Sequence, residues 1–186
     1  MTAPNETKTL REVKTDFAGR ASIALPTAVV GPYIVEARFG SIVTVAGSTI
    51  DLRSPIYGPA SDVETHLVIW PFTGFFSPVD NPGTTGVLNT VKAGSTVPFR
   101  FELGGNRGLS ILAQGYPKTV KYSCTSGTPE DLIEETNTAN DGLVYNVSTG
   151  QYQYNWKTPK NYAGSCYRFE LKLIDGTLHS ANFKFK

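Results

Sequence analysis

The chain has 186 residues, of which 40% are hydrophobic and 18% are charged, and its 17 Lys or Arg and 16 Asp or Glu residues give a formal net charge of +1. This length and hydrophobic content are enough to bury a core and argue against global disorder. The small net charge removes the basic surface by which nucleic-acid-binding proteins attract a polyanion. No apolar run approaches the roughly 20 residues of a membrane span, and residues 1–15 are too polar for a signal peptide.

Alternating apolar and polar residues predict β-strands along most of the chain. The predicted strands cover residues 20–25, 33–39, 41–45, 63–70, 96–103, 119–124, 142–147, 151–156, 167–174 and 177–185. Asp175-Gly176 lies between two alternating runs and is the clearest hairpin signal in the chain. Helical periodicity is nearly absent, and residues 129–136 predict at most one helical turn or a loop.

The distribution of turn-forming residues predicts two β modules of unequal size. Ser-Pro, Gly-Pro and Ala-Ser dipeptides cluster at residues 54–61, which we interpret as a linker. Residues 62–186 are enough for one sandwich, whereas residues 1–53 fall short of the roughly 100 residues of an immunoglobulin-like domain. We therefore predict an all-β chain: an immunoglobulin-like β-sandwich of the Greek-key type at 62–186, preceded by a partial β module at 1–53.

The two cysteines, Cys124 and Cys166, predict one disulfide. Neither has a second Cys or His two to four residues away, so the spacing does not favour a zinc site. An even pair in a chain of β-strands favours a disulfide and an oxidising compartment, and two buried free thiols are the alternative. A disulfide closing a loop of about 42 residues would contribute on the order of 4 kcal/mol in the chain-entropy model.

The two histidines, His66 and His179, are the candidate catalytic bases. A Ser–His–Asp triad needs an imidazole oriented by an acid and placed beside a nucleophile, and neither histidine lies near a Gly-x-Ser-x-Gly turn. We interpret both as solvated or edge-strand residues, although His179 shares the parity of Ala181, Phe183 and Phe185. The sequence thus predicts no catalytic residue and no enzyme.

The row of aromatic residues on the predicted strand 151–156 has two interpretations, as part of the core or as a binding surface. Tyr152, Tyr154 and Trp156 share one face, with Gln and Asn residues on the other. Aromatic side chains are a natural choice for a core, and we favour that interpretation; the alternative is a platform on which sugars stack. The run Phe99, Phe101 and Leu103 is interpreted as core in the same way.

One acidic cluster is a candidate cation site. It consists of Glu130, Asp131, Glu134 and Glu135. We interpret these carboxylates as a solvated patch, and calcium, which prefers oxygen ligands, is the alternative. No other cofactor is predicted.

From Phe72 onward the chain resembles the PxKF domain of bacterial secreted and surface proteins. The resemblance is carried by GFFSPVDNP at 74–82, VKAGSTVPFRF at 91–101, Leu103-Gly104-Gly105, Gly108-Leu109, TGQYQYNWKT at 149–158, the cysteine pair, and Asp175-Gly176-Thr177 with Ala181, Phe183 and Phe185. Arg100 stands where the family name has Lys, and a guanidinium does not replace a lysine amine. Any role that depends on that amine does not carry over.

Residues 15–23 and 31–39 resemble the second half of a bacterial immunoglobulin-like repeat, whose leading strands are missing here. Together the resemblances imply a non-catalytic, extracellular or cell-surface structural or adhesive module. A half-sandwich leaves strand edges unpaired, and three outcomes are open: it packs onto the larger domain, it is a truncated, partly disordered piece, or it accepts strands from another chain. We expect the third, with strands from other protein subunits or from copies of itself, as in an extracellular fibre. The alternative is a carbohydrate-binding accessory module of a secreted enzyme, and surface polysaccharide is a further expected partner.

Overall fold

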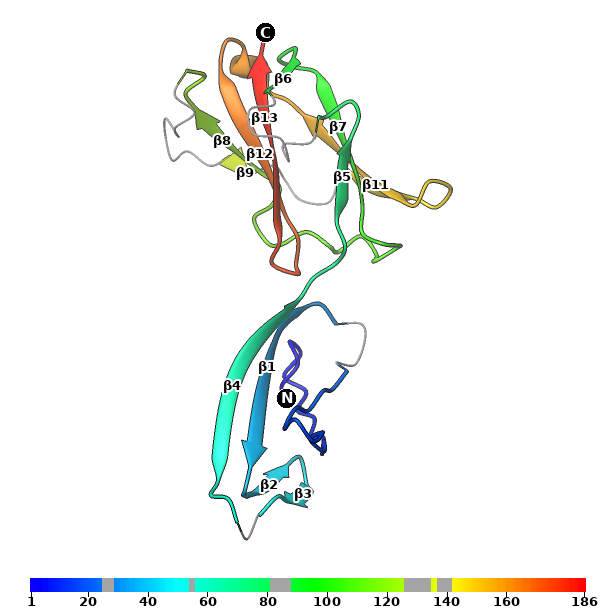
Figure 1. Ribbon diagram of the computed structural model, residues 1–186. Helices are drawn as coiled ribbons and strands as arrows, with labels where there is room; N and C mark the ends of the chain where they lie inside the picture. The colour runs from blue at the N-terminus through cyan, green and yellow to red at the C-terminus, as the bar shows by residue number, and fades with distance from the viewer. Residues whose placement is uncertain (25–28, 54–55, 81–87, 126–134, 137–141) are drawn as a thin grey trace. The chain divides into compact units, whose positions relative to one another are not determined.

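The computed structural model describes residues 1–24, 29–53, 56–80, 88–125, 135–136 and 142–186 (Figure 1). The chain forms two compact units, Met1–Ile69 and Trp70–Lys186, each described here by itself. The structure therefore places the boundary later than the linker expected at 54–61. Residues 60–68 form a strand that pairs inside the first unit, so a domain beginning at residue 62 is wrong. The sequence predicted most of this strand but assigned it to the second module.

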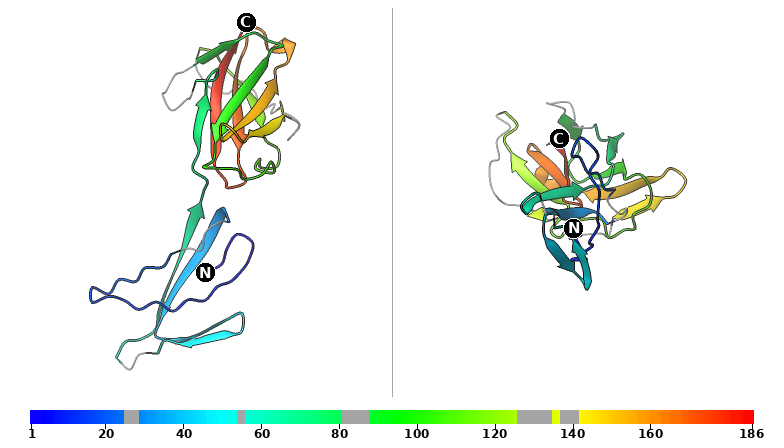
Figure 2. Two further views of the ribbon diagram at one scale, coloured as in Figure 1. Left: turned by 90° about the vertical axis from the view of Figure 1, so that its right-hand side faces the viewer. Right: turned by 60° about the horizontal axis from the view of Figure 1, so that its bottom comes forward.

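The C-terminal unit is built from two sheets, which confirms the expected all-β sandwich (Figure 2). One has the order β10(Leu143–Asn146)-β11(Gln151–Lys157)-β7(Thr96–Glu102)-β5(Thr73–Phe76). The other has the order β6(Leu88–Val91)-β13(Leu178–Phe185)-β12(Cys166–Lys172)-β8(Lys118–Tyr122)-β9(Glu135–Thr136). Neighbouring strands run antiparallel except for the parallel pair of β6 and β13. A short 3₁₀ helix, Lys160–Tyr162, precedes β12.

Aromatic side chains from both sheets fill the space between them. On β7, Phe99 and Phe101 are fully buried while Arg100 between them is exposed, as the alternation predicted. The rings of Phe99 and Phe169 stack with centroids 3.9 Å apart, which joins β7 of one sheet to β12 of the other. The interior is therefore a continuous core of large rings, whose burial supplies the main driving force for folding this unit.

The named strands of the N-terminal unit form two two-stranded ribbons. The longer pairs β1(Gly31–Phe39) with β4(Ala60–Val68), which run side by side in the left view of Figure 2. The shorter pairs β2(Ile42–Val45) with β3(Ser48–Asp51). Ala46 and Gly47 between them both have positive φ, 49° and 82°, as a type I′ hairpin turn requires.

The strand expected at 20–25 is not formed over residues 20–24, and residue 25 lies outside the described residues. The apolar residues of this segment have no described sheet to pack against: Ile23 is exposed, and no described strand pairs with the segment. Period-2 patterning predicts a strand only where a sheet is available to bury one face.

Of the segment considered for a helical turn, residues 135–136 form β9 and the others are not among those the structure describes. Among the described residues we find no helix with the length and apolar character to cross a membrane.

Candidate functional site

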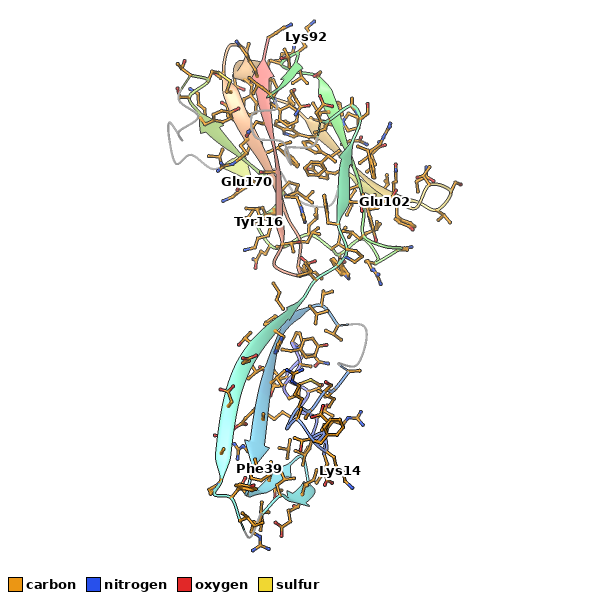
Figure 3. All side chains as sticks on the ribbon, in the orientation of Figure 1. Lys14, Phe39, Lys92, Glu102, Tyr116 and Glu170 are labelled. Carbon is orange, nitrogen blue, oxygen red and sulfur yellow. A yellow bond between two sulfur atoms is a disulfide. The ribbon has the colours of Figure 1, made fainter. Side chains whose placement is uncertain are left out.

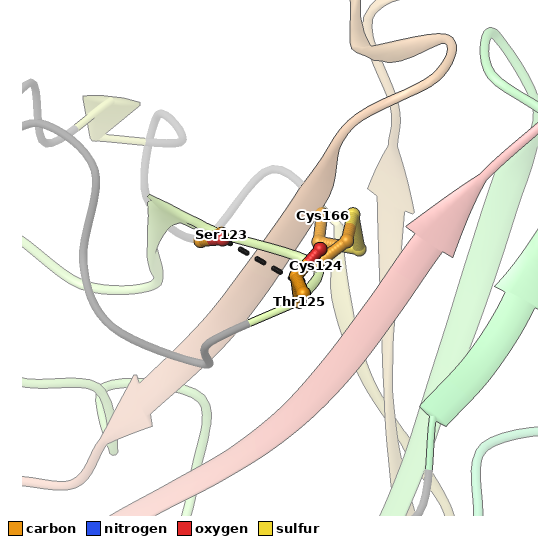
Figure 4. The surroundings of a disulfide bond; sticks show 4 residues. All are labelled: Ser123, Cys124, Thr125 and Cys166. Carbon is orange, nitrogen blue, oxygen red and sulfur yellow. Dashed lines mark hydrogen bonds between the residues drawn. A yellow bond between two sulfur atoms is a disulfide. The ribbon is translucent and has the colours of Figure 1, made fainter.

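The predicted disulfide is present between Cys124 and Cys166 (Figure 4). Its Cα atoms are 5.3 Å apart, and it joins residues separated by 42 positions. Cys166 begins β12, and Cys124 follows the end of β8, its neighbour in the same sheet. The bond therefore fastens two adjacent strands rather than linking the two sheets across the core.

The row of aromatic residues on β11 is buried, as the core interpretation expected. Tyr152, Tyr154 and Trp156 all face the space between the sheets and belong to the main core. The Tyr152 hydroxyl accepts a hydrogen bond from the backbone N–H of Arg107, and burial raises the pKa of Tyr152 above its ordinary value. Rings inside the core cannot stack on a sugar, so these residues are not a carbohydrate platform.

His179 is partly buried, which corrects the solvated alternative expected from the sequence. The edge alternative holds locally, because β6 pairs with β13 only at Asn182–Phe185 and, among the described strands, His179 pairs with β12 alone. It lies on β13, between β6 and β12 in the sheet order, and its ring stacks on Phe72 with centroids 3.5 Å apart. Its Nε2 lies 3.0 Å from the Thr177 hydroxyl. That hydroxyl donates to Oδ1 of the buried Asp175 at 2.6 Å.

This Asp–Thr–His chain has the members of a catalytic triad in the wrong order. In a triad the imidazole lies between the acid and the hydroxyl and takes the hydroxyl proton. Here the hydroxyl lies between the two and gives its only proton to the carboxylate, so Thr177 can only accept from His179. The other Asp175 oxygen, Oδ2, accepts the N–H of Trp70 at 2.9 Å. The cluster thus clamps the first residue of the C-terminal unit to the β12–β13 hairpin.

Burial lowers the pKa of His179 below its ordinary value of about 6.5, and the charge of Asp175 opposes that effect more weakly. We therefore expect the C-terminal unit to lose stability as the pH falls through about 6.5, because the unfolded chain then binds a proton that the folded unit resists. Urea unfolding followed by tryptophan fluorescence measures this, since both tryptophans, Trp70 and Trp156, lie in this unit.

His179→Gln should remove most of this pH slope. His66→Gln is the matched control, because His66 is exposed on β4 in the other unit and should leave the slope unchanged. An unchanged slope in H179Q would contradict the assignment.

The candidate calcium residues lie mostly outside the described residues. Glu130, Asp131 and Glu134 are not described, and Glu135 is placed in β9 without a described side chain. Over the parts of the chain that are described, no group of three or more His, Cys, Asp or Glu residues could hold a metal ion.

The feature that stands out chemically is the outer edge of β4. β4 is a nine-residue strand paired with β1 along one edge, and no described strand pairs with the other. The outer edge of β1 is occupied at Ile34, which exchanges two backbone hydrogen bonds with Thr2, at 2.8 and 3.0 Å. Among the described residues, β4 therefore has the more open edge of this ribbon, because nothing pairs with it along its nine residues while β1 is paired at Ile34.

The bonds of Ile34 also show which β4 residues present their backbone to that edge. Both backbone groups of Ile34 point toward Thr2, so its pair with Thr65 on β4 is of the non-hydrogen-bonded kind. The N–H and C=O of Thr65 consequently point outward, as do those of Ser61, Val63 and Leu67 at the same parity. Pro32 opposite Leu67 fits this pattern, because it has no N–H to offer β4.

The side chains along β4 are also exposed. Val63 and Leu67 are 57% and 56% exposed, and Ile34 on the same face of the ribbon is 48% exposed. Phe39 at the end of β1 is half exposed too, with its ring 6.3 Å from that of Tyr57 (Figure 3). An open edge flanked by exposed apolar side chains is a template for pairing with another strand.

Comparison of the chain with family models, with curated proteins and with solved structures finds no match in any of the three. Any functional conclusion therefore rests on the chemistry and geometry of the chain itself.

Proposed function

We propose that this chain is a non-catalytic structural module of a secreted or cell-surface protein, and that copies of it associate by strand addition at the outer edge of β4. The observation that carries the proposal is a nine-residue strand whose second edge is unpaired by any described strand. Strand addition satisfies such an edge with backbone hydrogen bonds and selects its partner through the side chains.

The small core of the N-terminal unit supports the proposal. Tyr33 and Val43 are its only buried hydrophobic side chains among the described residues. Small domains bury little apolar surface and are marginal when folded alone. Complete burial of one Val or Leu side chain contributes about 1.5–3 kcal/mol, so covering the exposed Val63 and Leu67 would be a substantial gain for this unit.

Strand order supports an immunoglobulin-like assignment for the C-terminal unit. An immunoglobulin domain has seven strands, A to G, with A, B, E and D in one sheet and C, F and G in the other. The same arrangement results here when the letters A to G are given in chain order to β5, β7, β8, β10, β11, β12 and β13: the first sheet then has the order D-E-B-A, and the second contains G-F-C. The disulfide differs from the antibody pattern, in which it joins strands B and F across the sandwich. Together with the resemblance of residues 72–186 to PxKF domains, this order favours a scaffold role.

The disulfide supports the proposed location outside the cytoplasm. Disulfides persist in oxidising compartments and are rare where thiols are kept reduced. Neither cysteine of the chain is free.

Sedimentation of the full chain over a wide range of concentrations tests the proposed function. We expect reversible, concentration-dependent association that Leu67→Lys abolishes, because a lysine on an exposed edge blocks strand pairing. Val144→Lys is the matched control: Val144 is 52% exposed on β10, the edge strand of the first sheet of the other unit. A chain that stays monomeric throughout, or association lost in V144K and retained in L67K, would overturn the proposal.

A further inference from the structure

We infer that two copies of this chain pair through antiparallel β4 strands about a two-fold axis at Thr65, so that the association is a closed pair. The inference rests on the proposed function and specifies its register. The resulting sheet would have the order β1-β4-β4-β1, in which the open edge of β4 in one copy pairs with the open edge of β4 in the other.

Backbone direction limits the possible registers. Ser61, Val63, Thr65 and Leu67 are the β4 residues whose N–H and C=O point to the open edge, so the hydrogen-bonded pairs of the interface must join odd-numbered positions to odd-numbered positions. Only a few two-fold registers meet this condition with substantial overlap. They place the axis at Val63, Glu64, Thr65 or His66.

Charge distinguishes these registers. An axis at Glu64 puts that carboxylate against its own copy, and an axis at Val63 puts Asp62 against Glu64; like charges directly opposite each other are destabilising. An axis at His66 puts the imidazole against its own copy and leaves Glu64 opposite Val68. An axis at Thr65 puts Glu64 opposite His66 of the second copy, twice.

The pairs at the Thr65 axis are favourable along the centre of the strand. Glu64 and His66 already lie 3.3 Å apart within one chain, Oε2 to Nε2, and both are exposed. Across the axis they occupy non-hydrogen-bonded positions, where side chains approach most closely, so two carboxylates and two imidazoles alternate on one face within hydrogen-bonding reach of one another. On the other face Val63 lies opposite Leu67, and the two Thr65 side chains meet. β4 is thus self-complementary about Thr65.

The partner that this pattern fits is a second copy of the chain. The segment Val63-Glu64-Thr65-His66-Leu67 has the same sequence of apolar, ionisable and hydroxyl side chains from either end, with a carboxylate at one ionisable position and an imidazole at the other. An isologous interface requires this property, because the same patch must recognise itself. A head-to-tail fibre through β4 would instead need a different strand as the complement.

Cysteine cross-linking of the full chain tests the register. Thr65→Cys should form a disulfide-linked dimer in high yield, because residues at a hydrogen-bonded antiparallel pair have Cα atoms about 5.5 Å apart, within disulfide range. Val63→Cys and Leu67→Cys, each alone, are the matched controls and should cross-link poorly, while the double variant V63C/L67C should cross-link well. The native cysteines do not interfere, because both are in the internal disulfide.

A charge exchange provides a second measurement. Glu64→Lys should weaken association at least about tenfold, because it places an ammonium opposite His66, and E64K/H66E should restore it to within about threefold. Association that persists with cross-linking at Val63→Cys or Leu67→Cys alone, or without rescue by the double variant, would overturn this register and leave the proposed function standing. Loss of all association in the unaltered chain would overturn both.

Discussion

Replacing both cysteines, as C124A/C166A, is expected to lower the free energy of unfolding of the C-terminal unit by about 4 kcal/mol. The bond spans 42 positions, so its removal frees a long stretch of the unfolded chain, which includes β10 and β11, from a closure constraint. The folded state keeps its other contacts, because β8 and β12 remain paired by backbone hydrogen bonds. Urea unfolding monitored by tryptophan fluorescence measures the change in this unit alone.

Val147→Ala is the control for this measurement. Val147 is 83% exposed and lies inside the segment that the disulfide closes, and its truncation should change the unfolding free energy by less than about 0.5 kcal/mol. Reduction of the unaltered chain should reproduce the effect of the double variant. A loss below about 1 kcal/mol in both experiments would mean that the closure constraint does not stabilise this fold.

The strands of the C-terminal core are largely predictable because their signal is local. Phe99 and Phe101 alternate with polar or exposed residues, and both point inward as expected. The Asp175-Gly176 hairpin is also where the turn chemistry predicted it. In contrast, the sequence does not predict β5 and β6 because their residues do not alternate between apolar and polar: Phe75 and Phe76 are adjacent in β5, and the buried residue of β6 is the polar Asn89.

The environment of His179 depends on a contact that no local pattern encodes. Its parity with Ala181 and Phe183 indicated an inward side chain, yet the absence of a motif favoured a solvated one. Phe72, which covers its ring, enters the site from the beginning of the unit and has no sequence signal linking it to β13. Parity was the better guide to the direction of the side chain, because a strand of a sandwich has one face to bury whatever the residue's chemistry.

The sequence predicted that the N-terminal module has an open strand edge, but not which strand carries it. The N-terminal module has too few residues for a sandwich, which predicted unpaired strand edges. Among the described residues, β4 has such an edge. Which edge is the more open depends on the pairing of Thr2 with Ile34, two residues far apart in sequence whose types carry no pairing preference. The direction of the Thr65 backbone follows from those same two hydrogen bonds, so it too required the structure.

Trp156→Ala is expected to destabilise the C-terminal unit by about 3–5 kcal/mol, the range for truncating a large buried ring. Trp156 is 1% exposed on β11, and its ring centroid lies 5.1 Å from that of Phe169 and 5.2 Å from that of Phe183. These neighbours belong to β12 and β13 of the opposite sheet, so the truncation would leave a cavity at the centre of the sandwich. Circular dichroism during urea unfolding measures the loss.

Trp156→Phe separates the effect of ring volume from that of the indole N–H. Trp156 Nε1 is buried without a hydrogen-bond partner among the described residues, and an unsatisfied buried donor costs about 1–3 kcal/mol. Phenylalanine keeps most of the ring contacts and removes that donor, so W156F should lose less than half as much stability as W156A. Equal losses in the two variants would contradict this, because they would mean that the N–H has a favourable partner in the folded unit.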